Sequence, residues 1–165
     1  MGHGGDRRHP REGPPLGCRR KRGAFAQAIG TSRGGRTSKL HALTDTAGRP
    51  RVLLLSAGNI NDMTMAGALL AAAKPFDRLI ADRGYDTNAV RALIAARGAQ
   101  AVIPSTAARR APIPYDRTAY RARNLVERLW CRLKDWRRVA TRYDKLARNY
   151  LSGVYLAATI IYWAN

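Results

Sequence analysis

The chain has 165 residues, and its 30 Lys and Arg residues against 11 Asp and Glu give it a formal net charge of +19. This length is enough for one domain with a hydrophobic core but hardly for two. So large an excess of positive charge predicts a polyanionic partner such as nucleic acid, although a ribosomal-type or merely basic protein has the same balance. The two cysteines form neither a disulfide framework nor a zinc-binding spacing, which fits a reducing cytoplasm.

Membrane and secretory signals are not evident. The N-terminus lacks the apolar core of a secretory signal. The longest apolar run, residues 150–163, is shorter than the roughly 20 residues that a membrane-spanning helix needs, and it predicts a buried C-terminal helix. We therefore expect a cytoplasmic protein.

The first part of the chain differs in composition from the rest. Residues 1–23 are rich in Gly, Pro, Arg and His, and their seven basic residues stand against Asp6 and Glu12. Because residues 1–23 have almost no apolar side chains to bury in a core, residues 1–27 are expected to form a disordered basic tail. Such a tail either binds phosphate groups non-specifically or has no specific partner.

A β-hairpin is predicted over residues 37–56. Residues 38–44 alternate between polar and apolar, residues 45–50 have turn chemistry, and residues 51–56 return as an apolar strand. Asp45 is assigned to the turn. His41 is either a packed strand residue or a functional one.

The sequence of residues 62–82 predicts a helix and then a strand that ends at an acidic residue, Asp82. Asp62 is a candidate N-cap for a helix over residues 63–73, and residues 78–81 form a short apolar strand. Asp82 follows that strand directly and precedes a glycine. This is where α/β sheets commonly display functional groups, and loop solvation is the alternative.

A further helix and strand follow. Asp86 is expected to cap a helix over residues 87–97, which Gly98 ends, and residues 100–104 form another strand. Residues 105–119, with two prolines, are expected to form a loop.

Residues 120–134 contain neither Gly nor Pro, and their apolar residues recur at helical spacing, which predicts a helix. At about 100° per residue, a strip roughly 60° wide lies at the edge of its apolar face. The strip consists of Tyr120, Arg123, Glu127 and Lys134. Arg121, Arg128 and Arg132 are expected to point to solvent. Arg123 and Glu127 are either an ordinary i,i+4 ion pair, worth roughly 0.2–0.5 kcal/mol, or part of a functional site.

Glu127, the one acidic residue of this predicted helix, is surrounded in the sequence by basic residues. Residues 109–148 hold 13 basic residues against four acidic ones, a net charge of +9. Trp136 and Tyr143 lie in the same stretch, where they either pack in the core or stack on bases.

The helix carries a recognisable signature. Its strip matches Y-x2-R-x3-E-x6-K without a gap, and this resembles the C-terminal motif of bacterial insertion-sequence transposases of the DDE type, the group related to the IS-four and IS-five families. Residues 81–86 are similar to that group's segment carrying the second catalytic Asp. Residues 32–41 and 140–145 are also similar to family segments, in the same order. The resemblance runs from about residue 28 to the C-terminus.

The resemblance implies a fold and a chemistry. The fold is an α/β, ribonuclease H-like catalytic core over residues 28–165, a mixed sheet with flanking helices that lacks its first strand. Asp82 and Glu127 would bind Mg²⁺ or Mn²⁺ in a two-metal site. In the family, water attacks a phosphodiester at the transposon end, and the freed 3′-OH then attacks target DNA.

The same resemblance implies how DNA is bound. Arg123 and Lys134 would contact DNA phosphate, and Tyr120 would help to position the strand. Apart from the resemblance, Arg128 and Arg132 are further candidate DNA-binding residues. The partners would be transposon ends and target DNA, with a homodimer as one arrangement on DNA.

The chain departs from the family at its start, where a first catalytic Asp is expected on a strand before the hairpin. Asp6 lies at roughly the expected distance, but its neighbours have no strand character. One hypothesis is that residues 1–23 are a frame-shifted or mis-started reading of a longer gene. Three interpretations therefore remain: an active DDE transposase domain, a non-catalytic DNA-binding remnant of an insertion sequence, and an unrelated basic nucleic-acid-binding protein.

Overall fold

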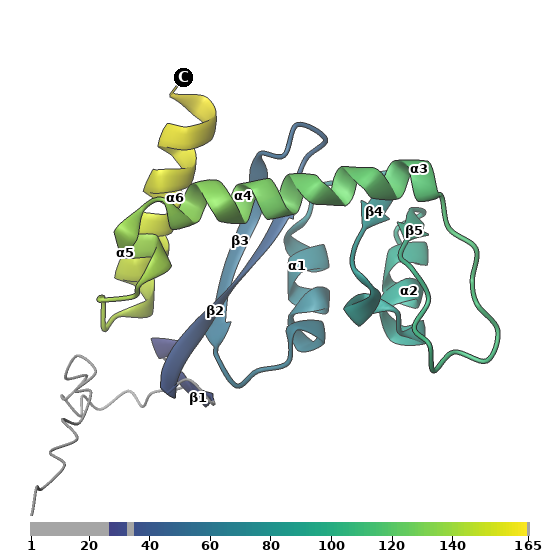
Figure 1. The fold of residues 1–165 in the computed structure, drawn as a ribbon, viewed down its shortest axis with the longest axis horizontal. Helices are drawn as coiled ribbons and strands as arrows, with labels where there is room; N and C mark the ends of the chain where they lie inside the picture. Colours follow the sequence, from purple (N-terminus) through teal and green to yellow (C-terminus); the bar gives the residue numbers. More distant parts are fainter. Residues whose placement is uncertain (1–26, 33–34, 165) are drawn as a thin grey trace, which may run out of the picture.

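The computed structural model describes residues 27–32 and 35–164, and Asp6 lies outside them. These residues form a mixed α/β structure, as the sequence predicted (Figure 1). The strands are β1 (Gly30–Ser32), β2 (Gly35–Thr44), β3 (Pro50–Ala57), β4 (Arg78–Ile80) and β5 (Gln100–Val102). The α-helices are α1 (Ala66–Ala72), α2 (Asn88–Ala95), α3 (Arg117–Tyr120), α4 (Asn124–Lys134), α5 (Arg137–Ala140) and α6 (Ala147–Trp163). Short 3₁₀ helices are η2 (Asp62–Met65), η3 (Arg83–Tyr85) and η4 (Arg121–Arg123).

The predicted hairpin is confirmed as β2 and β3, which pair antiparallel with Leu40 opposite Leu55. Its turn is built by Asp45, whose Oδ1 accepts hydrogen bonds from the backbone N–H groups of Ala47 at 2.9 Å and Arg49 at 3.0 Å. Gly48 completes the turn with a φ of +78°, a conformation that glycine adopts without steric cost. The sequence did not predict β1, which pairs antiparallel with the first residues of β2.

One hydrophobic core lies between the hairpin and the helices α4 and α6 (Figure 1). Because side chains alternate along a strand, the even-numbered residues Leu40 and Ala42 of β2 face this core. The apolar face predicted for α4 is confirmed, since Leu129 and Leu133 are fully buried. The buried members of this core are Leu53, Leu129, Leu133, Tyr150, Val154, Ala157 and Ala158.

A second core packs α1 and α2 against β4 and β5. These two strands pair parallel, with Leu79 opposite Ala101, and α2 forms the crossover between them. The buried members of this core are Ala66, Leu70, Val90, Ile94 and Ile103. In the part of the chain that is described, the strands thus form two separate sheets of order β1-β2-β3 and β4-β5.

Two predicted helix caps are wrong, because neighbouring residues provide the caps. Asn61 caps η2 by accepting a hydrogen bond from the Met63 N–H, and Asp62 instead lies inside this 3₁₀ helix. Thr87 caps α2 by accepting from the Val90 N–H. Both capping residues stand one position away from the acid that the sequence pattern favoured.

Asp86 instead anchors the loop that leads to α3. Its side chain is fully buried, and Arg91 and Arg109 form ion pairs with it at 2.7 and 3.0 Å. The Thr106 N–H donates a further hydrogen bond at 2.7 Å. Burial by itself raises the pKa of Asp86, but the hydrogen bonds from Arg109, Thr106 and Arg91 outweigh it and hold the pKa well below its usual range.

The C-terminal part is linked to the start of the described chain by Arg142. Its guanidinium donates to the backbone carbonyls of Gln27 at 2.8 Å and Ala28 at 3.2 Å, and it also contacts the Ser38 hydroxyl. Burial lowers the pKa of Arg142. The segment around Arg142 thereby fixes the entry to β1.

Among the residues described, no helix combines the length and the apolar character needed to cross a bilayer.

Candidate active site

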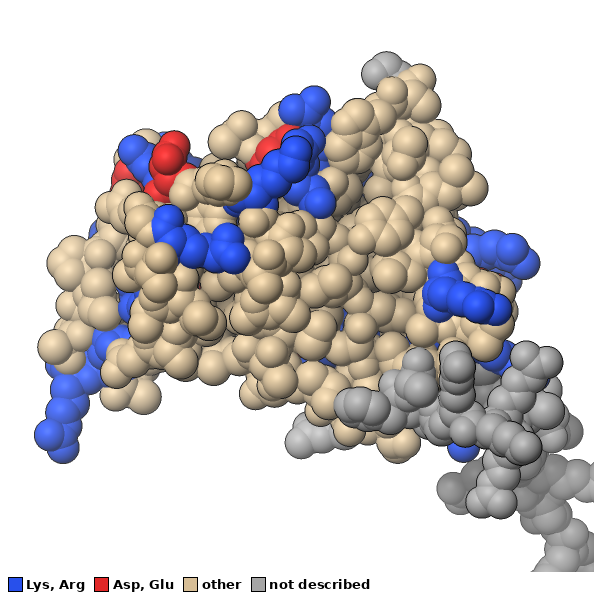
Figure 2. Space-filling view, turned by 180° about the vertical axis from the view of Figure 1, so that it is seen from behind, with Lys and Arg blue, Asp and Glu red and all other residues tan. Residues whose placement is uncertain are grey.

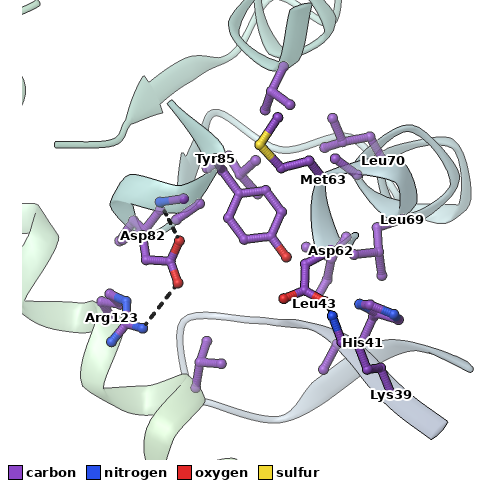
Figure 3. Close-up of a pocket in the computed structure, with 18 of the residues that line it drawn as sticks. Lys39, His41, Leu43, Asp62, Met63, Leu69, Leu70, Asp82, Tyr85 and Arg123 are labelled. Atoms are coloured by element: carbon purple, nitrogen blue, oxygen red, sulfur yellow. Dashed lines mark hydrogen bonds and ion pairs between the residues drawn. The ribbon is translucent and has the colours of Figure 1, made fainter. Parts of the chain in front are cut away.

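The candidate site lies at a cavity between β2, β4 and α4 (Figure 3). Asp82 reaches it from the end of β4. Arg123 reaches it from η4, and His41 from β2. Three segments far apart in the sequence therefore meet there. Figure 3 shows Asp82 and Arg123 on one side of this cavity, with Asp62, Lys39 and His41 on the other.

Asp82 is held by the turn that it begins. Its Oδ1 accepts a hydrogen bond from the Gly84 N–H at 2.9 Å, which fixes the carboxylate at the start of η3. A Cβ at position 84 would lie 3.0 Å from that oxygen, so the glycine allows the close approach. With Oδ1 engaged, Oδ2 faces Arg123 at 3.5 Å, and 44% of the side chain remains exposed.

Arg123 joins Asp82 to Glu127. The Arg123 Nη1 atom donates to Glu127 Oε1 at 2.5 Å, and Nη2 lies 3.5 Å from Asp82 Oδ2. The hydrogen bond to Glu127 raises the pKa of Arg123 above its ordinary value, and the charge of Asp82 acts in the same direction. The structure therefore brings together the two acids that the sequence singled out, 45 positions apart, on one guanidinium.

The other strip residues of the helix lie outside this cluster. Tyr120 packs edge-to-face on Tyr115, with ring centroids 5.4 Å apart. Lys134 is in the last turn of α4, which places it about 10 Å along the helix axis from Glu127. Of the four strip residues, only Arg123 and Glu127 therefore belong to the cluster around Asp82.

The exposed arginines of α4 are Arg128 and Arg132, as expected. The guanidinium of Arg132 lies 5.4 Å from the Tyr162 ring centroid on α6, a contact that the sequence did not predict. Figure 2 shows Lys and Arg side chains in separate groups, some at the margins of this face and others within its upper part, and the acidic side chains in view lie against basic ones. Positive charge is thus unevenly distributed over this surface.

On the opposite wall of the cavity, the sequence left the role of His41 open and assigned Asp62 only to a helix cap. Asp62 forms an ion pair with Lys39 at 3.0 Å. His41 is buried and lies 2.7 Å from the Ser56 hydroxyl, and burial lowers its pKa. The signal was present in the alternation of β2, which places the odd-numbered Lys39 and His41 on one face.

Tyr85 stands between the two acids of this cavity in Figure 3. Burial raises the pKa of its phenol, and the charges of Asp62 and Asp82 raise it further. Among the described residues, no group of three His, Cys, Asp or Glu side chains is placed to hold a metal ion, so Asp82 and Glu127 stand as a pair.

Comparisons with known proteins show which family this chain belongs to. A family model described as a transposase DDE domain matches residues 79–164, which include both Asp82 and Glu127. The chain belongs to the transposases of the DDE type.

Two relatives define the similarity more closely. A protein of Brucella ovis named as a transposase for insertion sequence element IS6501 is 33% identical over 127 residues, which are 76% of this chain and 98% of the relative. A protein of Burkholderia cepacia named as a transposase for insertion sequence element IS402 is 31% identical over 144 residues, 81% of this chain and 66% of that relative. The chain is therefore a transposase of the bacterial insertion-sequence type, and its function is transposition. The comparison with solved structures found no significant match.

Proposed function

We propose that residues 28–165 form a ribonuclease H-like catalytic domain that cuts and joins DNA at Asp82 and Glu127. The observation that carries this proposal is the single guanidinium of Arg123, which contacts both carboxylates. The order of elements supports it, because an antiparallel hairpin is followed by a parallel β-α-β unit and by a helix that returns to the end of β4.

The two carboxylates fit a divalent metal ion. Carboxylate oxygens are the donors that Mg²⁺ and Mn²⁺ prefer, and Mg²⁺ commonly takes only one or two of them, with water and phosphate oxygens completing its shell. The side chains of Asp82 and Glu127 are 44% and 61% exposed, and Asp82 Oδ2 meets Arg123 only at the long distance of 3.5 Å. Bound in a two-metal site, such ions would activate the attacking oxygen and stabilise the leaving oxygen of a phosphodiester.

The chain's own residues would hold the DNA. In this proposal Arg123 leaves the carboxylates when metal binds, and its guanidinium then turns to a DNA phosphate. Arg128, Arg132 and Lys134 are exposed along α4 and would bind further phosphates, while Tyr120 would position the strand. The partners would be transposon ends and target DNA, bound by a homodimer.

The test is metal-dependent cleavage. The full chain is incubated with Mg²⁺ or Mn²⁺ and a labelled duplex that carries the ends of the insertion sequence encoding it. Cleavage is expected with the wild type, and Asp82→Asn and Glu127→Gln should each lower its rate at least a hundredfold. The matched controls Asp77→Asn, just before β4, and Asp135→Asn, at the end of α4, should retain it.

A non-catalytic role in DNA binding is the second candidate. The observation that favours it is the pair of acids where the family's site has three, within the residues described; Asp6, the sequence candidate for the third, lies outside them. Specific binding to the transposon ends with no cleavage in either metal would support this role and contradict the catalytic proposal.

A further inference from the structure

The outer face of α6 exposes large apolar side chains. The inner face of this helix is buried in the core that it shares with the hairpin and α4. At about 100° per residue, Leu156, Ile160 and Trp163 lie together on the outer face. Their side chains are 61%, 37% and 46% exposed. Gly153 is exposed on the same side, and we call these four residues the α6 seam.

The spacing of the α6 seam is typical of a helix that pairs with another helix. Its residues recur at intervals of three, four and three, so they follow one line along the helix, as the a and d positions of a heptad do. In the described part of the chain this line remains open to solvent, as the exposed fractions show. The seam therefore has the pattern of a helix pair but only one of the two helices.

Gly153 has no steric purpose within a single copy of the chain. It lies in the interior of a 17-residue helix, where glycine lowers helix stability relative to alanine. A Cβ at this position would meet no atom within 4 Å. A glycine does, however, leave room for a large side chain of a second helix. Gly153 is therefore a recess in the seam.

The same face is free of charge in a strongly basic chain. Residues 149–165 contain no Asp, Glu, Lys or Arg, although the chain has a net charge of +19. Figure 2 shows tan surface, without charged side chains, over the last turns of α6. DNA phosphate requires cations, so this face offers DNA no contact. Two copies of a chain with this charge repel each other, and an uncharged face lets them meet without burying like charges.

A second copy of the chain supplies a matching helix. In an antiparallel pair related by a two-fold axis, each contact occurs twice, with the two residues exchanged between the copies. If Leu156 faces Ile160 of the second copy, the same register sets Gly153 against Trp163 of the second copy. The largest side chain of the seam then enters the recess at its glycine.

We propose that the α6 seam is the interface of a homodimer, in which the α6 helices of two copies pair antiparallel. The dimer deepens the proposed function and rests on it for its role, because it holds two catalytic domains for two transposon ends. Burial of the apolar side chains of the seam drives the pairing. The positive charge of the rest of the chain opposes it, so salt or DNA that screens this charge favours the dimer.

The test is sedimentation velocity of the full chain at about 0.1 and about 0.5 M NaCl. The higher salt should tighten the dimer about threefold, the opposite of its effect on DNA binding. Leu156→Glu and Ile160→Lys should each weaken self-association at least tenfold, because each places two charges in the seam. Leu93→Glu replaces an exposed leucine of α2 and should associate like the wild type. Circular dichroism checks that all three variants fold.

A mixture of two variants tests the register. In a heterodimer of Leu156→Glu with Ile160→Lys, the new carboxylate of one copy faces the new ammonium of the other, and the second contact of the pair keeps its Ile160 and Leu156. Equimolar mixing should therefore restore the association that neither variant shows alone.

A glycine substitution separates helix stability from pairing. Gly153→Ala should raise the melting temperature at a concentration where the chain is monomeric, because alanine favours the helix, yet it should weaken the dimer about threefold. Gly67→Ala, in α1, should raise the melting temperature and leave the dimer unchanged.

Several results would overturn the proposal. They are a wild type that stays monomeric at about 100 μM in the higher salt and on DNA, equal association of Leu156→Glu and Leu93→Glu, and a mixture that stays monomeric. Slow hydrogen exchange at residues 153–163 in a monomer would show that another part of the chain covers the seam. Sedimentation does not require catalysis, so a wild type that dimerises through the seam without cutting DNA contradicts only the proposed function.

Discussion

The guanidinium of Arg123 lies 2.5 Å from Glu127 Oε1, and its other terminal nitrogen lies 3.5 Å from Asp82. A cation thus already occupies the position between the two carboxylates that the proposed metal ion would share. Arg123 neutralises the acids without metal, and it must compete with any divalent ion that binds them. Substitution of Arg123 should therefore change the affinity of the two carboxylates for a divalent metal ion.

The first prediction concerns metal affinity. Arg123→Ala removes the competing charge and leaves the carboxylates repelling each other, so Mn²⁺ should bind about threefold to tenfold more tightly than to the wild type. The measurement is the rise in melting temperature across a Mn²⁺ titration. Arg121→Ala, an exposed arginine two residues earlier, should titrate like the wild type. Identical titrations of all three proteins would show that the carboxylates do not share the ion.

The second prediction concerns DNA. Arg128 is exposed on α4, and its proposed role is a phosphate contact, which carries no sequence information. Arg128→Gln should therefore weaken binding of different DNA sequences by similar factors. The slope of log K against log salt should fall by about 0.9, the value for one lost phosphate contact. Arg51→Gln, which removes an exposed arginine from β3, is the matched control, and an unchanged slope for Arg128→Gln would place the DNA elsewhere.

The third prediction concerns Asp86 and acid stability. Asp86→Asn leaves Arg91 and Arg109 without their buried partner and should lower the free energy of unfolding by about 3–5 kcal/mol. Asp77→Asn, which removes an exposed carboxylate, should change it by less than about 0.5 kcal/mol. Urea unfolding measures both.

The pH dependence of stability follows from the same carboxylate. The pKa of Asp86 is lower in the folded protein than its ordinary value of 3.8. The unfolded chain therefore takes up a proton first as the pH falls. The stabilisation is complete above that ordinary value and is lost as the pH falls through the folded-state pKa. Asp86→Asn should flatten this acid branch of the stability curve, and an unchanged branch would contradict the assignment.

The fourth prediction concerns the hairpin turn. Gly48 has a φ of +78°, and a Cβ at this position would lie 3.4 Å from the Leu125 side chain on α4. Gly48→Ala should therefore destabilise the protein by about 1 kcal/mol or more. Gly67→Ala is the control, because Gly67 lies in α1 with open space around it, and there alanine should stabilise by roughly 0.5–1 kcal/mol. Equal effects in thermal unfolding would show that the turn tolerates a side chain.

Local patterns in the sequence were sufficient for most of the elements. Strand alternation and turn residues determined the hairpin, because these signals act over a few neighbouring residues. The caps at Asp62 and Asp86 were predicted wrongly, since a neighbouring Asn or Thr can cap equally well and the choice depends on tertiary partners. Asp86 is the clearest case, because Arg109 reaches it from 23 positions away.

The sequence by itself also singled out Asp82 and Glu127, through motifs that resemble those of DDE transposases, and the family match confirms the family. Only the tertiary structure places both acids on one guanidinium. It also decides that Asp62 and His41 form the opposite wall of the cavity. The physical reason is distance along the chain: no local periodicity relates residues 41, 62, 82 and 127. Only the packing of α4 across the hairpin and the β4–β5 pair brings residues 41, 62 and 82 to one cavity, with Glu127 held beside it by Arg123.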